Sequence, residues 1–131
     1  MEERSLVAAA KTVRLNAYAP YSKFLVGAAL LTESGEVFTG CNVENISFGL
    51  TLCAERVALG SAVAAGHKAF HMIAIVADTA SPISPCGACR QVLAEFTPGL
   101  KVVLATLKGD IERFSLEELL PRAKTGILEK P

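Results

Sequence analysis

Three cysteines and one glutamate form the most chemically informative pattern in this chain. Cys53 precedes Glu55 by two positions, and Cys86 and Cys89 follow later in a C-x-x-C arrangement. Three thiolates can bind a zinc ion and leave its fourth coordination position open to water. Glu55 is not needed as a ligand and is therefore available to transfer protons. The pattern predicts a zinc site with an open catalytic position, as in hydrolytic deaminases of bases.

The charge of such a site needs compensation, because three thiolates around a dipositive ion leave a net charge of minus one. Cys53 opens one expected helix, and Cys86 and Cys89 lie at the start of another. Helix N-termini carry about +0.5 charge each and lower thiol pKa values. Arg56 is three positions after Cys53 and Arg90 is directly after Cys89, and both can neutralise more of the charge. Of the two, we expect Arg56 to be the partner of a ligand sulfur.

Other interpretations of the cysteines compete with this one. A C-x-x-C pair can be a redox dithiol or half of a structural zinc site, and Cys41 would then be the candidate fourth ligand. Strand periodicity places Cys41 on the face opposite to Asn42 and Glu44. Because cysteine is among the most buried residue types, we favour Cys41 as a packed thiol. His67 and His71 flank a loop near a helix end and are expected to be solvated.

The spacing of Cys53 and Glu55 is a geometric difficulty. Residues two apart on an ideal helix point to nearly opposite sides. Either Cys53 lies in the frayed first turn, or the Glu55 side chain bends back towards the N-terminus, and the sequence leaves both possibilities open.

Length and composition restrict the protein class. The chain has 131 residues, which we expect to form one domain over 1–131. It has 13 basic and 13 acidic residues, and this balance argues against a nucleic-acid partner held through its backbone. The longest apolar run, Leu25–Leu31, is too short for a membrane span. The acidic start lacks an apolar core, so no signal peptide is expected, and the cysteines indicate a reducing, cytoplasmic location.

Hydrophobic periodicity predicts helices and strands in mixed order. We expect helices in an N-terminal segment ending near Tyr18, over 53–65, over 84–96 from a Ser84 cap and Pro85, and after a Ser115 capping box. Strands are expected over 24–31, 36–44, 70–77, 101–107 and 111–114, the first two as a hairpin through Ser34-Gly35. The order predicts an α/β fold, a three-layer α/β/α sandwich around a mixed five-stranded sheet with right-handed crossovers.

The chain resembles the cytidine deaminases, specifically the short, single-domain, homotetrameric class. The resemblance covers nearly the whole chain and is carried by blocks that match in order and spacing: Ala19-Pro20-Tyr21-Ser22-Lys23-Phe24, Val26-Gly27-Ala28-Ala29, Gly40-Cys41-Asn42-Val43-Glu44-Asn45, Cys53-Ala54-Glu55-Arg56 and Pro85-Cys86-Gly87-Ala88-Cys89-Arg90-Gln91. It implies zinc-dependent conversion of cytidine and 2′-deoxycytidine to uridine and 2′-deoxyuridine, within pyrimidine salvage.

The resemblance also implies roles for named residues. Cys53, Cys86 and Cys89 match the ligands of one zinc ion per chain, and Glu55 matches the proton shuttle. The positions that match nucleoside-binding residues are Phe24, Asn42, Glu44 and Ala54, with Asn42 and Glu44 contacting ribose hydroxyls. From the residues alone, Asn42 and Glu44 would pass for polar positions on a surface strand. The family further implies a homotetramer whose active sites are shared between subunits.

Two positions depart from the family pattern. Phe48 stands where tyrosine is common, and Lys124 stands where many relatives have a phenylalanine that stacks on the base in a neighbouring subunit.

Three alternative functions compete with the one that the resemblance implies: a deaminase of a modified cytosine nucleoside such as an antibiotic, a polynucleotide-editing deaminase and a non-catalytic structural zinc domain. The neutral charge and few aromatic residues disfavour the second. A water on the zinc, in place of a fourth protein ligand, would exclude the third.

Overall fold

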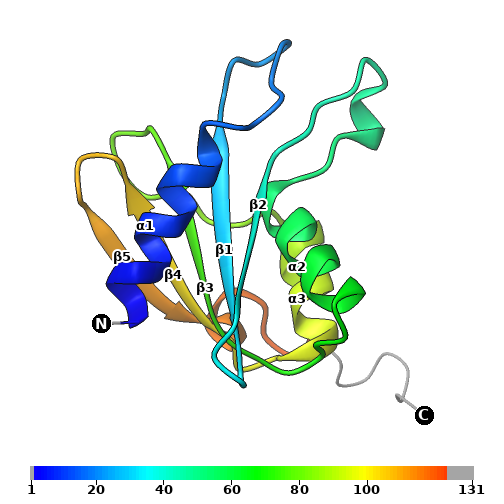
Figure 1. The fold of residues 1–131 in the computed structure, drawn as a ribbon, viewed down its shortest axis with the longest axis vertical. Helices are drawn as coiled ribbons and strands as arrows, with labels where there is room; N and C mark the ends of the chain where they lie inside the picture. Colours follow the sequence, from blue (N-terminus) through cyan, green and yellow to red (C-terminus); the bar gives the residue numbers. More distant parts are fainter. Residues whose placement is uncertain (1, 124–131) are drawn as a thin grey trace.

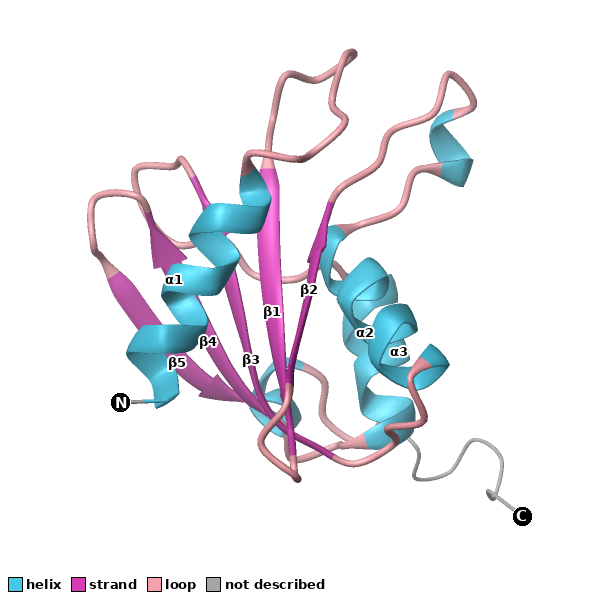
Figure 2. Ribbon diagram, viewed as in Figure 1, coloured by secondary structure: helices cyan, strands magenta, loops and turns pink. Residues whose placement is uncertain are grey.

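The computed structural model describes residues 2–123, which form a sheet covered by helices (Figures 1 and 2). In chain order the elements are α1 (Glu2–Arg14), β1 (Val26–Thr32), β2 (Val37–Cys41), the 3-10 turn η1 (Phe48–Leu50), α2 (Ala54–Ala64), β3 (Phe70–Ala77), α3 (Gly87–Phe96), β4 (Lys101–Thr106), β5 (Ile111–Ser115) and α4 (Leu116–Leu119). The predicted strand 70–77 and the Ser115 capping box are confirmed.

The five strands make one mixed sheet, as predicted, and their order in it is β2-β1-β3-β4-β5. Strands β1 and β2 form the expected antiparallel hairpin, and Gly35 in its turn has a φ of +93°, which glycine adopts without a steric penalty. Strands β3 and β4 are parallel, and the other neighbours are antiparallel. Because β1 lies between β2 and β3, the connection through α2 passes over β1 before the chain rejoins the sheet.

Helices cover both faces of the sheet, which confirms the three layers (Figure 2). On one face α1 packs Leu6, Val7 and Ala10 against alternate residues of the central strands. On the other face α2 and α3 lie side by side and bury a second core that includes Ile73 and Leu104. All seven residues of β1 are consequently buried. Within residues 2–123, no helix combines the length and apolar character that crossing a membrane requires.

Helix α2 lies very close to strand β2 because of Gly40. A Cβ atom at Gly40 would lie 2.4 Å from the nitrogen of Ala58 and 2.5 Å from the carbonyl oxygen of Ala54. Only glycine allows this approach, so the residue sets the height of the first turn of α2 above the sheet. That turn carries Glu55 and directly follows Cys53.

Several element boundaries differ from the sequence prediction, and two of these differences lie beside the cysteines and the long loops. Strand β2 ends at Cys41, not at residue 44. After Cys41, the Asn42 side chain forms hydrogen bonds with the Phe24 carbonyl oxygen and the Val26 amide, in place of further strand pairing. Helix α3 begins at Gly87, and its N-cap is Cys86. The prediction of Ser84 as cap and Pro85 as first helical residue is therefore wrong by two positions.

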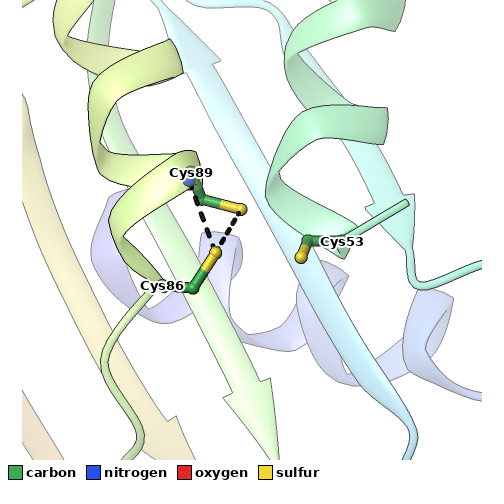
Figure 3. A group of neighbouring side chains, drawn as sticks. All are labelled: Cys53, Cys86 and Cys89. Atoms are coloured by element: carbon green, nitrogen blue, oxygen red, sulfur yellow. Dashed lines mark hydrogen bonds between the residues drawn. The ribbon is translucent and has the colours of Figure 1, made fainter. Parts of the chain in front are cut away.

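Two long loops extend beyond the same end of the sheet, over 15–25 and 42–53 (Figure 1). Isolated bridges join Val43 to both Tyr18 and Leu52, so the two loops are tied together at their bases. The cysteine-bearing ends of α2 and α3 lie at this end of the molecule (Figures 1 and 3).

Candidate active site and metal centre

The sulfur atoms of Cys53, Cys86 and Cys89 come together at the N-terminal ends of two neighbouring helices (Figure 3). All three lie within 4.8 Å of one another, and the Sγ atoms of Cys86 and Cys89 are 3.4 Å apart. Tetrahedral zinc with Zn–S bonds of about 2.3 Å requires sulfur separations of roughly 3.8 Å. The three thiols therefore suit a zinc ion with little rearrangement.

Cysteines cap both helices that converge on this group. Cys53 is the N-cap of α2, with an extended backbone at φ −75° and ψ 153°. Cys86 is the N-cap of α3, and its Sγ accepts a hydrogen bond from the amide of Cys89 in the first turn. Both helix N-termini thus direct partial positive charge at the thiols. The sequence left open whether Cys53 lies at the helix start or the Glu55 side chain bends back. Because Cys53 precedes the first helical residue, the structure favours a cysteine at the helix start.

The acid–base properties of the thiols are those of a cation-binding group. A hydrogen bond with the Cys89 thiol, followed by the Arg56 guanidinium, lowers the pKa of Cys53 to about 5. The pKa of Cys89 is strongly raised, first by its hydrogen bond to Cys53 and then by burial. One thiol ionises at the expense of its neighbour, so three thiolates coexist here only with a cation between them.

The two arginines beside the ligand cysteines have different contacts. The Nη2 atom of Arg56 lies 3.5 Å from Cys53 Sγ and 3.5 Å from the carbonyl oxygen of Thr51. Its Nε is buried without a hydrogen-bond partner among residues 2–123. The Arg90 guanidinium instead donates to the carbonyl oxygens of Pro85 and Leu119, and no contact with a sulfur is seen within the described residues.

Glu55 supplies a buried carboxyl group next to the thiols. The residue is only 5 % exposed, and burial, together with the negative charge of Cys53, raises its pKa to about 7. A carboxyl group with this pKa can both accept and release a proton near neutral pH.

A cavity of about 230 Å³ opens onto the thiols and this carboxyl group. It is lined by Phe24, Val26, Asn42, Thr51, Cys53, Ala54, Glu55, Ile83, Ser84 and Cys86. Of the sequence-predicted nucleoside contacts, Phe24, Asn42 and Ala54 lie in it, whereas Glu44 lines an adjoining pocket with Tyr21, Ser22, Phe48 and Thr51. Thr51 lines both spaces. Sequence reasoning missed Thr51, Ile83 and Ser84, for which no motif exists.

Asn42 holds the segment that forms one wall of the cavity. Its Nδ2 donates to the carbonyl oxygen of Phe24 at 2.8 Å, and its Oδ1 accepts from the amide of Val26 at 2.9 Å. The two polar groups of the Asn42 side chain thus bond the backbone on both sides of Leu25. These bonds fix the backbone of Phe24 at the cavity.

The Glu44 carboxylate is already hydrogen-bonded within the protein. It accepts bonds from the amides of Tyr21 and Ser22, at 3.0 and 3.1 Å, and from the Ser22 hydroxyl. The Ser22 bonds keep the pKa of Glu44 below its usual value. Glu44 is partly exposed, and through these bonds it organises the 15–25 loop.

Among the described residues, the remaining candidates do not line the cavity. Cys41 is half-buried and outside the metal-binding group of the described residues, so a fourth cysteine ligand is not formed. His67 and His71 lie near Glu36 and Glu2 respectively, at 3.3 and 3.8 Å. Phe48 is exposed and packs edge-on against Tyr21. Lys124 lies outside the described residues.

A mixed five-stranded α/β fold with three thiols at two helix N-termini and a buried glutamate beside them defines a zinc-binding deaminase. The chain belongs to the cytidine and deoxycytidylate deaminase family, since the family model described as "Cytidine and deoxycytidylate deaminase zinc-binding region" matches residues 1–106.

Similar proteins agree with this placement over nearly the whole chain. The cytidine deaminase of Sporosarcina psychrophila is 53 % identical over 124 residues, which are 94 % of this chain and 91 % of that protein. The cytidine deaminase of Halalkalibacterium halodurans is 52 % identical over 127 residues, or 96 % of each chain. A crystal structure of cytidine deaminase from Burkholderia pseudomallei superposes with a TM-score of 0.90 at 55 % identity, covering 93 % of this chain and 98 % of that one.

Proposed function

We propose that this enzyme hydrolytically deaminates cytidine and 2′-deoxycytidine, giving uridine and 2′-deoxyuridine with release of ammonia. The observation that carries the proposal is the buried Glu55 carboxyl group, which shares one cavity with Cys53 and Cys86. The two relatives at 53 and 52 % identity, which bear the name cytidine deaminase, support it.

Cys53, Cys86 and Cys89 would hold one zinc ion per chain. When bound, such an ion supplies a water nucleophile that is activated near neutral pH. Arg56 would offset the excess negative charge of the thiolates through its contact with Cys53. Both helix N-termini act in the same direction.

Glu55 would move the protons of the reaction. Its carboxylate accepts a proton from the attacking water and delivers it to N3 of the cytosine ring, which makes C4 more electrophilic. A C4–O bond forms and the C4–N bond breaks. Glu55 transfers the second proton of the water to the departing amine, so that ammonia leaves. Glu55 is only 5 % exposed, which limits access of bulk water to this carboxyl group.

The nucleoside would span the cavity and the adjoining pocket. Phe24 and Ala54 would contact the base, while Asn42 and Glu44 would contact ribose hydroxyls. This arrangement is supported by Thr51, which lines both spaces. It gives Glu44 two tasks, since the carboxylate that binds the sugar also holds Tyr21 and Ser22 in place.

We further infer that the protein is a homotetramer whose active sites are shared between subunits. The loop over 42–53 exposes a run of apolar side chains beside the cavity: Ile46 at 80 %, Phe48 at 73 % and Leu50 at 66 %. A second copy of the chain would cover this apolar surface and close the adjoining pocket. Phe48 would then act as an apolar contact, and Lys124 would replace an aromatic side chain with a cation.

Residues 1–131 would act as one zinc domain in cytoplasmic pyrimidine salvage, with a small nucleoside as partner and no nucleic acid. The balanced charge supports the latter point, because 13 basic and 13 acidic residues provide no net attraction to phosphates.

The test is the loss of ultraviolet absorbance when the zinc-loaded protein is mixed with cytidine or 2′-deoxycytidine. Rapid loss with one zinc per chain is the expected result. A zinc-loaded protein that leaves both nucleosides unchanged would contradict the proposal. In that case activity on a modified cytosine nucleoside, measured in the same way, would distinguish a changed substrate from a non-catalytic zinc domain.

A further inference from the structure

Arg90 connects the loop that carries Cys86 to the C-terminal helix α4. Its Nε donates to the carbonyl oxygen of Pro85 at 2.7 Å, and its Nη1 donates to the carbonyl oxygen of Leu119 at 2.8 Å. Both bonds are short and charge-assisted, and such bonds are roughly twice as strong as neutral ones. One part-buried guanidinium thus joins a carbonyl 5 residues before it to a carbonyl 29 residues after it in the chain.

The first of these carbonyls belongs to the peptide unit that leads directly into Cys86. Fixing the Pro85 oxygen fixes the plane of that peptide, and therefore the starting direction of the Cys86 backbone. The backbone amide of Arg90 also donates to the Cys86 carbonyl oxygen at 2.9 Å. Arg90 consequently holds the peptide groups on both sides of this cysteine.

The second carbonyl provides a firm anchor. Leu119 is the last residue of α4, so its carbonyl has no partner within the helix. Helix α4 is itself secured to the core: Leu116 is fully buried, its amide donates to the Leu100 carbonyl oxygen at 2.8 Å, and the Ser115 capping box closes the first turn.

The Cys86 loop needs such an anchor more than the other ligand positions do. Residues 78–86 connect β3 to α3 without regular secondary structure, and Cys86 is the exposed member of the three thiols, whereas Cys89 is buried in α3. The Sγ of Cys86 accepts a hydrogen bond from the Cys89 amide, and its other partners are the thiols of Cys89 and Cys53.

We propose that Arg90 is a positioning residue for the metal centre, which holds Cys86 in ligand geometry by tying the Pro85 carbonyl to the end of α4. The inference rests on the proposed role of Cys86 as a zinc ligand. It assigns Arg90 a task distinct from that of Arg56, which contacts a sulfur directly. Lysine cannot replace it fully, because an ammonium lacks the planar fork that reaches two carbonyls in fixed directions.

The experiment compares Arg90→Met and Arg90→Lys with Gln91→Met as the matched control. Gln91 is the next residue of α3 and donates to the carbonyl oxygen of Ala123 at 3.3 Å, in the same C-terminal segment. Within the described residues, no side-chain hydrogen bond joins it to the Cys86 loop. Zinc release to a chromogenic chelator is timed for each protein. The cobalt-loaded forms are examined by absorption spectroscopy, since the cobalt–thiolate bands report ligand geometry directly.

We expect Arg90→Met to release zinc about 10- to 100-fold faster than the wild type, the range typical of lost outer-shell partners, with altered cobalt bands. Arg90→Lys should lie between the two, and Gln91→Met should match the wild type. Should Arg90→Met fail to fold, faster release from Arg90→Lys than from Gln91→Met supports the same assignment.

Unchanged release rates and cobalt bands in the Arg90 variants would overturn the inference, even if their unfolding temperature fell, because the tie would then serve stability alone. A wild type that binds no zinc would also overturn it. A wild type that binds zinc but leaves cytidine unchanged would contradict only the proposed reaction, since none of these readouts requires turnover.

Discussion

Cys53 and Glu55 line the same cavity although only one residue separates them, because Cys53 caps helix α2 in an extended conformation while Glu55 lies in the first helical turn. Two residues at this spacing inside a helix would point apart. The change of backbone conformation after Cys53 removes the conflict. It places a thiol at the helix N-terminus and a carboxyl group beside it, and Ala54 between them is fully buried.

The first prediction concerns the proton-transfer role of Glu55. Glu55→Gln keeps the size and burial of the side chain but cannot exchange a proton. We expect it to bind one zinc per chain and to lose at least about 10²- to 10⁴-fold in kcat, the usual contribution of general acid–base catalysis. The rate is followed by ultraviolet absorbance with cytidine, and zinc by elemental analysis. A zinc-loaded variant with near wild-type turnover would refute the assigned role.

The second prediction concerns the ligand set. Cys86→Ser removes one of the three thiols and should reduce bound zinc well below one per chain after dialysis against a weak chelator. Cys41→Ser is the matched control, because Cys41 is half-buried outside the group. It should retain one zinc per chain. Loss of zinc from Cys41→Ser would indicate a fourth thiol ligand and a structural site.

The third prediction separates the two tasks of Glu44. Glu44→Ala removes ground-state contacts with the sugar and should chiefly raise KM. It also removes the acceptor of the Tyr21 and Ser22 amides. Ser22→Ala leaves that carboxylate in place but deletes its hydroxyl partner, and should raise KM less.

Glu33→Ala provides the control for Glu44, because Glu33 is an exposed carboxylate in the turn between β1 and β2. It should leave both kinetic constants unchanged. An unaltered KM in Glu44→Ala would count against sugar recognition by this residue.

The parts of the fold that follow from local sequence were predictable. Strand β3 was found to the residue because an apolar run without charge between turns permits little else, and the Ser115 capping box is a local pattern. The start of α3 was not predictable, because a proline such as Pro85 is equally suited to the first helical position and to the loop that it occupies. Only the sulfur of Cys86, accepting from the Cys89 amide, decides between them.

The site was predictable where residues act by type and unpredictable where they act through distant partners. The cysteines and Glu55 stand out by chemistry and spacing. The partner of Glu44 is 22 residues away at Ser22, and the partner of Arg90 is 29 residues away at Leu119. No local pattern specifies either contact, because tertiary packing brings these backbone groups within reach.

The fourth prediction tests the close packing of α2 on β2. Gly40→Ala would place a Cβ 2.4 Å from the Ala58 nitrogen, so the first turn of α2 must shift. Overpacking of this kind costs about 1–3 kcal/mol. We expect lower stability in urea and slower turnover, because Cys53 and Glu55 move with the turn.

Gly60→Ala is the control for that effect. Gly60 lies within α2, and a Cβ there would meet no atom within 4 Å. Replacing a helix-interior glycine by alanine should raise stability by about 0.5–1 kcal/mol without affecting turnover. Equal stabilities for the two variants would contradict the steric role of Gly40.

The last prediction is the pH dependence of the tie between α1 and β5. The Glu3 carboxylate accepts from Arg113 a hydrogen bond that Nε shares between both oxygens, at 2.9 and 2.8 Å, and one from Nη2 at 2.6 Å. These bonds, with the charge of Arg113 and then of Lys101, hold the pKa of Glu3 below its usual 4.5. A carboxyl group whose pKa is lowered by folding stabilises the native state while it is ionised.

The sign of the effect follows directly. Above about pH 4.5 Glu3 is ionised in both folded and unfolded chains, so the full contribution is present. As pH falls through the lower pKa of the folded state, the carboxylate is protonated and the contribution is lost. The free energies of unfolding in urea of the wild type and Glu3→Gln should therefore differ at pH 7, and this difference should shrink as the pH falls below about 4.5. The zinc-free protein is used throughout, because acid also releases zinc from thiolates.

Arg113→Gln identifies the partner. If Arg113 is the main cause, the double variant should be no less stable at pH 7 than the less stable single variant, since the two changes remove one interaction. A stability gap between wild type and Glu3→Gln that persists undiminished at pH 3 would show that the carboxylate acts through packing instead. The difference in free energy of unfolding between the wild type and Arg113→Gln would then also be independent of pH. Neither variant would lose stability through the charge of Glu3.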